Sequence, residues 1–180
     1  VLQALYYCLR AFRRLVAADA VCLHLYGCDL ARAPDGRWWV VNDRTQGPSG
    51  TGYALQNRLI VAPLYGALFR SLGVQGLGRF FRVLQEQLAT LAPTNGETPN
   101  IVLLTPGPYS ETYFEHVFLA RYLGFALVEG SDLTVRNGRV FLKTLEGLRR
   151  VHVILRRLDD EYCDPVALRA DSALGVPGLV

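Results

Sequence analysis

Residues 47–52, Gly-Pro-Ser-Gly-Thr-Gly, have the types and spacing that most directly suggest chemistry. Their glycines permit backbone conformations that expose consecutive N–H groups, an arrangement that suits binding of an anion or a phosphate. Ser49 and Gly50 are the candidate contacts, with Arg58 a little further along the chain. The alternative is a plain turn into a helix capped by Ser49 or Thr51, because the loop matches no Walker-type or dinucleotide pattern.

A second polar group is expected at one end of a β-hairpin. Apolar runs over 21–31 and 37–43 flank an Asp-Gly pair, which is a strong hairpin signal. If Asp35-Gly36 is a two-residue loop, Asp29 lies opposite Asn42 and Arg44 extends the same face. The other side chains then divide between the two faces, and a loop one residue longer would swap these faces. Leu25, Trp38 and Val40 share the Asp29 face, and Tyr26, Cys28, Trp39, Val41 and Asp43 point the other way.

A third group follows two strands of the second half. The turn over 105–111 leads from a short apolar strand into a helix, where open α/β sheets usually bind ligands, so Tyr109 and Glu111 are candidate substrate contacts. The run over 156–161 supplies Arg156, Arg157, Asp159 and Asp160 as further candidates. Arginine holds carboxylates through two parallel hydrogen bonds, so this run could orient a carboxylate-bearing or zwitterionic substrate. A salt-bridge network at the end of a strand is an equal alternative, and His116 and His152 are expected to be structural.

Composition limits the possible classes. The chain has 180 residues, 51% hydrophobic and 19% charged, with a net charge of +3, so we expect a globular protein with no nucleic-acid partner. No apolar run reaches the length of about 20 residues that a membrane span needs. The four cysteines form no Cys-x-x-Cys pair, which favours a reduced, cytoplasmic setting and makes a zinc site improbable.

The pattern of elements predicts an α/β fold with α+β elements at the N-terminus. A helix over 1–18, the hairpin and helices over 53–58, 60–72 and 77–91 form a first domain, 1–92. A linker over 93–100 leads to a Rossmann-like α/β domain, 101–180. That domain contains a β-α-β unit with strands at 101–104 and 126–129 around a helix over 111–123. A second hairpin turns at Asn137-Gly138, and another strand covers 151–155.

The two ends of the chain carry their own expectations. The first 18 residues contain arginines and no acidic residue, so a packed amphipathic helix, an organellar transit segment and a partner-binding helix are all open. The chain has no methionine and opens on Val1, from which we expect a piece of a longer protein or a processed product.

Many short motifs in order resemble the circularly permuted ATP-grasp proteins of type 2, over nearly everything from Val21 onward. In the first half these are Gly27-Cys28-Asp29-Leu30, residues 34–40 (PDGRWWV), Pro48-Ser49-Gly50 and residues 53–58 (YALQNR). In the second half they are residues 104–107 (LTPG), 113–116 (YFEH), 127–130 (LVEG), 153–160 (VILRRLDD) and 171–178 (DSALGVPG).

The resemblance implies that the chain is part of a bacterial-type carboxylate–amine ligase related to glutathionylspermidine synthetases. Such enzymes use ATP and Mg²⁺ to form an acyl phosphate that an amine attacks, giving an amide as in peptide synthesis. The chain would hold the metal-side hairpin and the substrate-side α/β domain, and residues that grip ATP would lie outside it. The fragment alone is therefore expected to be inactive. The implied partners are a small carboxylate and an amine or peptide, together with an all-helical partner domain and a transglutaminase-like protein.

The same resemblance assigns site residues. Asp29 and Asn42 stand at metal-ligand positions, and Arg44 and Asp43 are the catalytic candidates. Asp43 could join the metal site only if a bulge turned it onto the other face. The family pattern has Glu where this chain has Asn42, and Asn where it has Arg44. Because Arg44 beside Asp29 is expected to form an ion pair, either Arg44 binds phosphate with less metal, or the chain is a degenerate ATP-grasp that serves as a non-catalytic scaffold.

Overall fold

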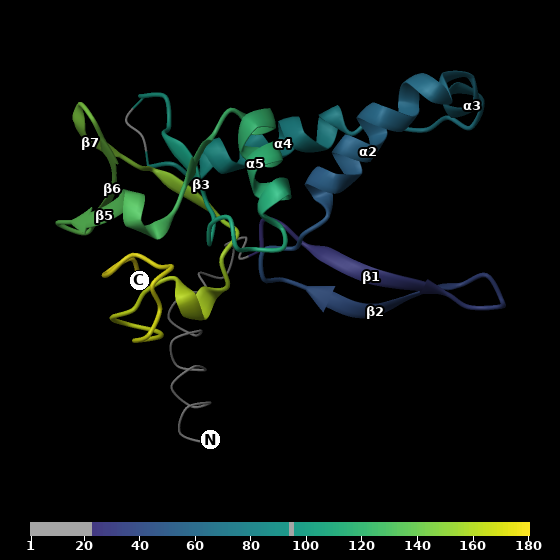
Figure 1. Ribbon diagram of the computed structural model, residues 1–180. Helices are drawn as coiled ribbons and strands as arrows, with labels where there is room; N and C mark the ends of the chain where they lie inside the picture. Colours follow the sequence, from purple (N-terminus) through teal and green to yellow (C-terminus); the bar gives the residue numbers. More distant parts are fainter. Residues whose placement is uncertain (1–22, 94–95) are drawn as a thin grey trace, which may run out of the picture. The chain divides into compact units, whose positions relative to one another are not determined.

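The computed structural model describes residues 23–93 and 96–180 (Figure 1). The helix predicted over 1–18 lies outside these residues. The fold is mixed α/β, as the sequence predicts. Its residues group into two compact units, one ending at Thr45 and the other spanning Gln46–Val180. The predicted linker at 93–100 falls inside the second unit, and the domain division at this linker stays a prediction.

The first unit is the predicted antiparallel hairpin, with β1 over Gly27–Arg32 and β2 over Trp38–Arg44. Its loop has three residues, not the predicted two, because Ala33 donates its N–H to the carbonyl of Arg37. Gly36 closes this turn with φ +85°, a left-handed conformation that glycine adopts without strain.

The hairpin register combines the longer loop with a β-bulge. The three-residue loop pairs Trp39 with Ala31, which lies two residues from Asp29 and so on the same face of β1. Trp38, Trp39 and Val40 therefore have the swapped faces expected for a loop one residue longer, not those of the two-residue loop. A register shift between Asp29 and Leu30 then compensates for the extra residue. Asp29 therefore lies opposite Asn42, as predicted.

The second unit begins with three helices. They are α2 over Thr51–Leu64, α3 over Gly66–Ser71 and α4 over Gly78–Thr90. Pro63 lies inside α2, which continues one residue past it and breaks at Tyr65, so the helix predicted over 60–72 is divided between α2 and α3. A proline has no N–H to donate to the carbonyl four residues before it and its ring crowds that carbonyl, which agrees with the end of α2 at Leu64.

A three-stranded parallel sheet forms the centre of this unit (Figure 1). Its order is β4–β3–β8, with β3 over Ile101–Leu104, β4 over Ala126–Val128 and β8 over Val153–Arg156. Helix α5, Tyr113–Leu123, connects β3 to β4, which confirms the predicted β-α-β unit. All four residues of β3 are buried; Val102 and Leu104 belong to one apolar cluster and Leu103 to another. One cluster includes Val128, Leu133 and Val176, and the other includes Leu55, Phe81 and Leu119.

A separate antiparallel sheet contains β5 over Leu133–Arg136, β6 over Arg139–Thr144 and β7 over Gly147–Arg150. The predicted Asn137-Gly138 turn is confirmed, with φ +52° and +66° at its two residues. Strand β7 was not predicted, since its sequence Gly-Leu-Arg-Arg has little apolar alternation. Within the described residues, no helix is both long enough and apolar enough to cross a bilayer.

Candidate functional site

The polar end of the hairpin is an ion pair with an amide beside it. Arg44 donates from Nε and Nη2 to the Asp29 carboxylate, with the Nη2–Oδ2 distance 2.7 Å, and Asn42 donates to the same oxygen at 3.2 Å. These hydrogen bonds, first from Arg44 and then from Asn42, lower the pKa of Asp29. The expected Asp29–Arg44 pair is confirmed.

This hairpin end does not fit Mg²⁺. Magnesium prefers carboxylate and water oxygens in octahedral geometry, whereas the only carboxylate of this trio already binds a guanidinium. Asp43 lies opposite Cys28 in the strand register and accepts a hydrogen bond from the Tyr26 hydroxyl. Its side chain therefore does not lie on the face of the hairpin that carries Asp29. Over 23–93 and 96–180, no three His, Cys, Asp or Glu side chains are grouped to hold a metal ion.

The glycine-rich loop does bind an anion, and that anion is Glu115 of the same chain. One Glu115 oxygen accepts the N–H of Gly50 at 2.8 Å, the N–H of Gly52 at 2.9 Å and the hydroxyl of Thr51 at 3.3 Å. Gly50 is the N-cap of α2, with φ +111°. Glu115 therefore caps α2 from helix α5, satisfying backbone donors that a helix N-terminus leaves without partners.

Arg157 binds the other side of Glu115. Its Nη2 lies 3.4 Å from Glu115 Oε2, and its Nη1 donates to the carbonyl of Pro48 at 2.9 Å. Both side chains are fully buried. Burial lowers the pKa of Arg157 and the nearby Glu115 charge opposes that shift. The buried Glu115–Arg157 ion pair thus holds together the glycine-rich loop, α5 and the end of β8.

His116 is a buried, neutral side chain. Its Nδ1 lies 2.9 Å from the Thr105 hydroxyl and its Nε2 lies 3.0 Å from the Thr112 hydroxyl. Burial, reinforced by the positive charge of Arg157, lowers its pKa to about 4. The imidazole thereby ties the turn after β3 to the first turn of α5, which agrees with the expected structural role.

The remaining predicted residues of the second half lie around the carboxyl ends of β3 and β8. Arg156 donates to the carbonyl of Leu158 and to Gln46, and Gln46 in turn donates to Asp160. These contacts are hydrogen bonds, and within the described residues no ion pair joins the arginines and aspartates of 156–160, so the salt-bridge network that the sequence left as an alternative is not formed inside this run. Four predicted side chains are exposed: Tyr109, Glu111, Asp159 and Asp160.

The structure thus separates the predicted site residues into groups. Asp29, Asn42 and Arg44 lie together on the hairpin, and Asp43 lies on its other face. In the second unit, Glu115 connects Gly50 to Arg157, and Gln46 connects Arg156 to Asp160. Ser49 is exposed. Arg58 lies apart, donating to the carbonyl of Gln75 and covering the Phe69 ring.

Glu115 is the residue that sequence reasoning missed. It shares the i, i+4, i+8 stripe of α5 with Leu119 and Leu123, both buried. A carboxylate at a core position of an amphipathic helix needs a buried partner, and this was the available signal. Asp164 was also missed; it is buried and accepts backbone N–H groups from Val166, Ala167, Gly178 and Val180.

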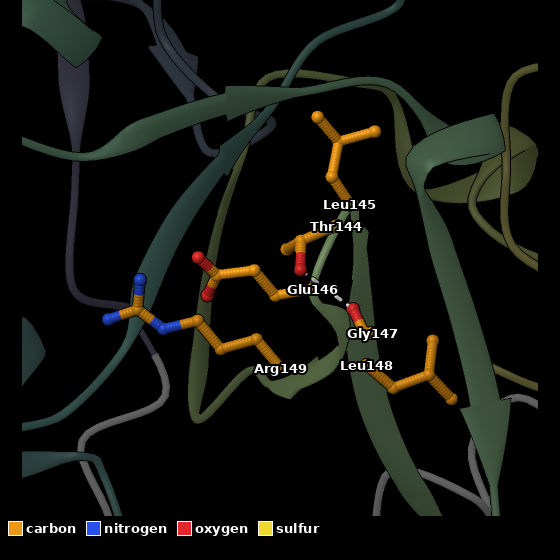
Figure 2. A pocket seen from close by; sticks show the side chains of 6 residues that line it. All are labelled: Thr144, Leu145, Glu146, Gly147, Leu148 and Arg149. Carbon is orange, nitrogen blue, oxygen red and sulfur yellow. Dashed lines mark hydrogen bonds between the residues drawn. The ribbon is translucent and has the colours of Figure 1, made fainter.

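A hollow of about 470 Å³ lies elsewhere, at the turn between β6 and β7 (Figure 2). Its lining comes from one segment: Thr144, Leu145, Glu146, Gly147, Leu148 and Arg149. It contains none of the predicted site residues, and its lining is limited to the end of β6, the turn and the start of β7. A surface built by a single hairpin segment offers few converging groups for a ligand.

Comparison with known proteins gives the family. The circularly permuted ATP-grasp type 2 family matches residues 1–180, the whole chain, so the chain belongs to this family. The resemblance inferred from the motifs is thereby confirmed. The family fits an ATP-dependent ligase and in general binds ATP and Mg²⁺.

Curated relatives are similar in sequence but carry no described activity. The uncharacterized protein Rv2567 of Mycobacterium tuberculosis is 47% identical over 158 residues, which is 88% of this chain and 18% of that protein. The uncharacterized protein sll0335 of Synechocystis is 43% identical over 157 residues, 87% of this chain and 33% of that protein. The uncharacterized protein Rv2411c of M. tuberculosis is 43% identical over 166 residues, 92% of this chain and 30% of that protein. The chain therefore spans between about a fifth and a third of these relatives.

Proposed function

We propose that this chain forms part of an ATP-dependent carboxylate–amine ligase. In the proposed reaction, a substrate carboxylate attacks the terminal phosphorus of ATP, giving an acyl phosphate and ADP. The amine then attacks the acyl carbon, inorganic phosphate leaves, and the amine loses a proton as the amide forms. The observation that supports this most strongly is the family match over the whole chain.

The described residues suggest a division of roles within this proposal. The exposed Tyr109, Glu111, Asp159 and Asp160 at the carboxyl ends of β3 and β8 are proposed to contact the carboxylate and amine substrates. Arg156 and Arg157 are proposed to hold this edge of the sheet in position, because both donate hydrogen bonds to other groups of the protein. Arg44 is proposed to bind a phosphate group, since its side chain is half exposed. Any Mg²⁺ is proposed to be held by residues other than the Asp29 trio.

The wider setting is also proposed, on the family resemblance alone. A small carboxylate and an amine or peptide are the substrates. An all-helical domain and a transglutaminase-like protein are the protein partners, and the setting is cytoplasmic.

The test uses the full-length protein. It is incubated with ATP, Mg²⁺ and pooled carboxylates and amines, and ADP release is measured alongside amide formation by mass spectrometry. We expect ADP and amide in equal amounts, and at least a tenfold loss of turnover in Arg44→Ala. Arg32→Ala removes another exposed arginine of the same hairpin and is the matched control, with turnover unchanged. A full-length protein that neither binds ATP nor turns over would refute the ligase proposal.

The second candidate is a non-catalytic scaffold with the same fold. Its specific support is the Asp29–Arg44 ion pair, which occupies the carboxylate that a metal would need. The double change Asn42→Glu and Arg44→Asn restores the family pattern and releases Asp29. If the metal site has lapsed, this variant gains Mg²⁺ affinity, measured by calorimetry. Unchanged Mg²⁺ affinity would count against the scaffold.

A further inference from the structure

Four basic side chains share one face of the antiparallel sheet β5–β6–β7. Paired residues of neighbouring strands have their side chains on the same face, and so do residues two apart on one strand. The pairs that decide the face are Arg136 with Arg139, Thr134 with Phe141, Phe141 with Arg150, and Lys143 with Leu148. This face, here called the basic face, therefore carries Arg136, Arg139, Lys143 and Arg150.

The opposite face of the sheet packs into the protein. Leu133 belongs to one of the two apolar clusters of the second unit, and Val135, Val140 and Leu142 pack against that cluster. The basic face is therefore the solvent side of the sheet. Three of its basic side chains, Arg136, Arg139 and Lys143, are exposed, and Arg150 is partly buried.

The positive charge of the basic face is not balanced within the protein. The three strands contain no Asp or Glu. Over 23–93 and 96–180 none of the four basic side chains takes part in an ion pair, and Lys143 donates to the neutral carbonyl of Ser131 at 2.8 Å. Asp132, just before β5, uses its carboxylate to accept the N–H of Glu129.

The pair Arg136–Arg139 also opposes the stability of its own hairpin. The two arginines lie directly opposite each other on neighbouring strands, and like charges in that position destabilise a sheet. An anion bound between them would remove this repulsion. The pair is thus better suited to binding an anionic partner than to stabilising the fold.

The spacing of the charges indicates the form of that partner. They lie in three rows across the sheet, formed in order by the Arg136–Arg139 pair, by Arg150 and by Lys143. Successive rows are two residues apart along the strands, which is about 7 Å. An extended peptide repeats its side chains on one face at the same interval. Carboxylates at alternate positions therefore match the rows, and arginine binds a carboxylate through two parallel hydrogen bonds.

We propose that the basic face is the docking site for a short, extended acidic segment of a partner protein, with Asp or Glu at alternate positions. The strands of the sheet have four to six residues, so the bound segment is of similar length. A single strand of nucleic acid fits less well, because its bases need aromatic side chains on which to stack. Phe141 is the single aromatic residue of the three strands, and it is partly buried.

The test uses the full-length protein and two labelled, capped peptides of equal charge and composition, followed by fluorescence anisotropy. The alternating probe is Thr-Glu-Thr-Glu-Thr-Glu-Thr, and the block probe is Thr-Thr-Glu-Glu-Glu-Thr-Thr. We expect the protein to bind the alternating probe at least threefold more tightly than the block probe. The double variant Arg136→Gln and Arg139→Gln should bind the alternating probe at least tenfold more weakly.

The double variant Arg79→Gln and Arg82→Gln is the matched control, because it removes the same charge from two exposed arginines of α4. It should leave binding of the alternating probe unchanged, and circular dichroism should show that both variants are folded. Three results overturn the proposal. They are alternating-probe binding that is absent or no tighter than block-probe binding, equal weakening by the two double variants, and binding of oligothymidine or phosphatidylserine vesicles through Arg136 and Arg139 without binding of the alternating probe.

Discussion

Glu115 and His116 are neighbours on α5 that hold different parts of the second unit. Glu115 binds the loop before α2 and pairs with Arg157, and His116 joins the hydroxyls of Thr105 and Thr112. Burying a charge is costly unless it is paired and hydrogen-bonded, and Glu115 meets both conditions. These buried polar side chains thus form their hydrogen bonds with other groups of the same protein.

Replacing Glu115 by glutamine keeps a hydrogen-bond acceptor but removes the charge. Arg157 is then an uncompensated buried cation, so we expect Glu115→Gln to lower the free energy of unfolding by about 3 kcal/mol. Urea denaturation followed by circular dichroism measures this. Glu111→Gln, an exposed glutamate just before α5, is the control and should change stability by less than about 0.5 kcal/mol. Equal effects of the two substitutions would show that the Glu115 pair contributes no net stability.

The lowered pKa of His116 predicts a dependence of stability on pH. The folded protein binds a proton at His116 only near pH 4, whereas the unfolded chain does so near 6.5. The unfolded state therefore takes up more protons between these values. Stability should fall by up to about 3 kcal/mol as the pH decreases from about 6.5 to about 4.

Urea denaturation of native protein at several pH values measures this dependence, and His116→Gln should flatten the profile in that window. His24→Gln, which removes an exposed histidine, should keep the native slope. A His116→Gln profile as steep as the native one would rule out His116 as the titrating group.

At the scale of elements, α2 shows how a helix boundary depends on a distant residue. The sequence predicts a helix from Tyr53, with a cap from Ser49 or Thr51 as the alternative to an anion-binding loop. The observed helix starts at Thr51, and its donors are satisfied by Glu115. The start of α5 also differs from the prediction. The helix begins at Tyr113, after the N-cap residue Thr112, whereas the prediction placed its start at Glu111.

Gly52 marks the close approach of α2 to α5. A Cβ atom at this position would lie 2.6 Å from Glu115 Cγ and 3.2 Å from Leu119 Cγ. We therefore expect Gly52→Ala to destabilise the protein by about 2 kcal/mol through overpacking, measured by thermal or urea unfolding.

The control for this substitution is Gly78→Ala, at the first residue of α4, where no atom lies within 4 Å of the added Cβ. It should stabilise the protein by about 0.5 kcal/mol, since alanine loses less backbone entropy in a helix. If Gly52→Ala leaves the stability of the protein unchanged, α2 and α5 can move apart at little cost in free energy.

At the scale of the whole molecule, the chain is two compact units of very different character. The hairpin exposes Trp38, Trp39, Val40 and Val41, while the larger unit has a buried parallel sheet and two apolar clusters. An isolated two-stranded hairpin is at best marginally stable in water. Since this chain spans a third or less of the curated relatives named above, their additional length is available for further contacts.

The sequence by itself determined the elements that depend on local signals. Alternating apolar residues around Asp-Gly and Asn-Gly predicted both hairpins, and the apolar run 101–104 followed by an amphipathic helix predicted the parallel unit. These features need only periodicity and turn chemistry within a few tens of residues.

The tertiary structure alone decided which groups meet over longer distances. The bulge that restores the register at Asn42, the carboxylate that fills the Gly50–Gly52 loop, and the partner of Arg157 were not predicted. Glu115 lies more than 60 residues from the loop and 42 from Arg157 along the chain, so no local pattern joins them. Burial in one core made these contacts obligatory, because each charge and backbone donor removed from water must find a partner within the protein.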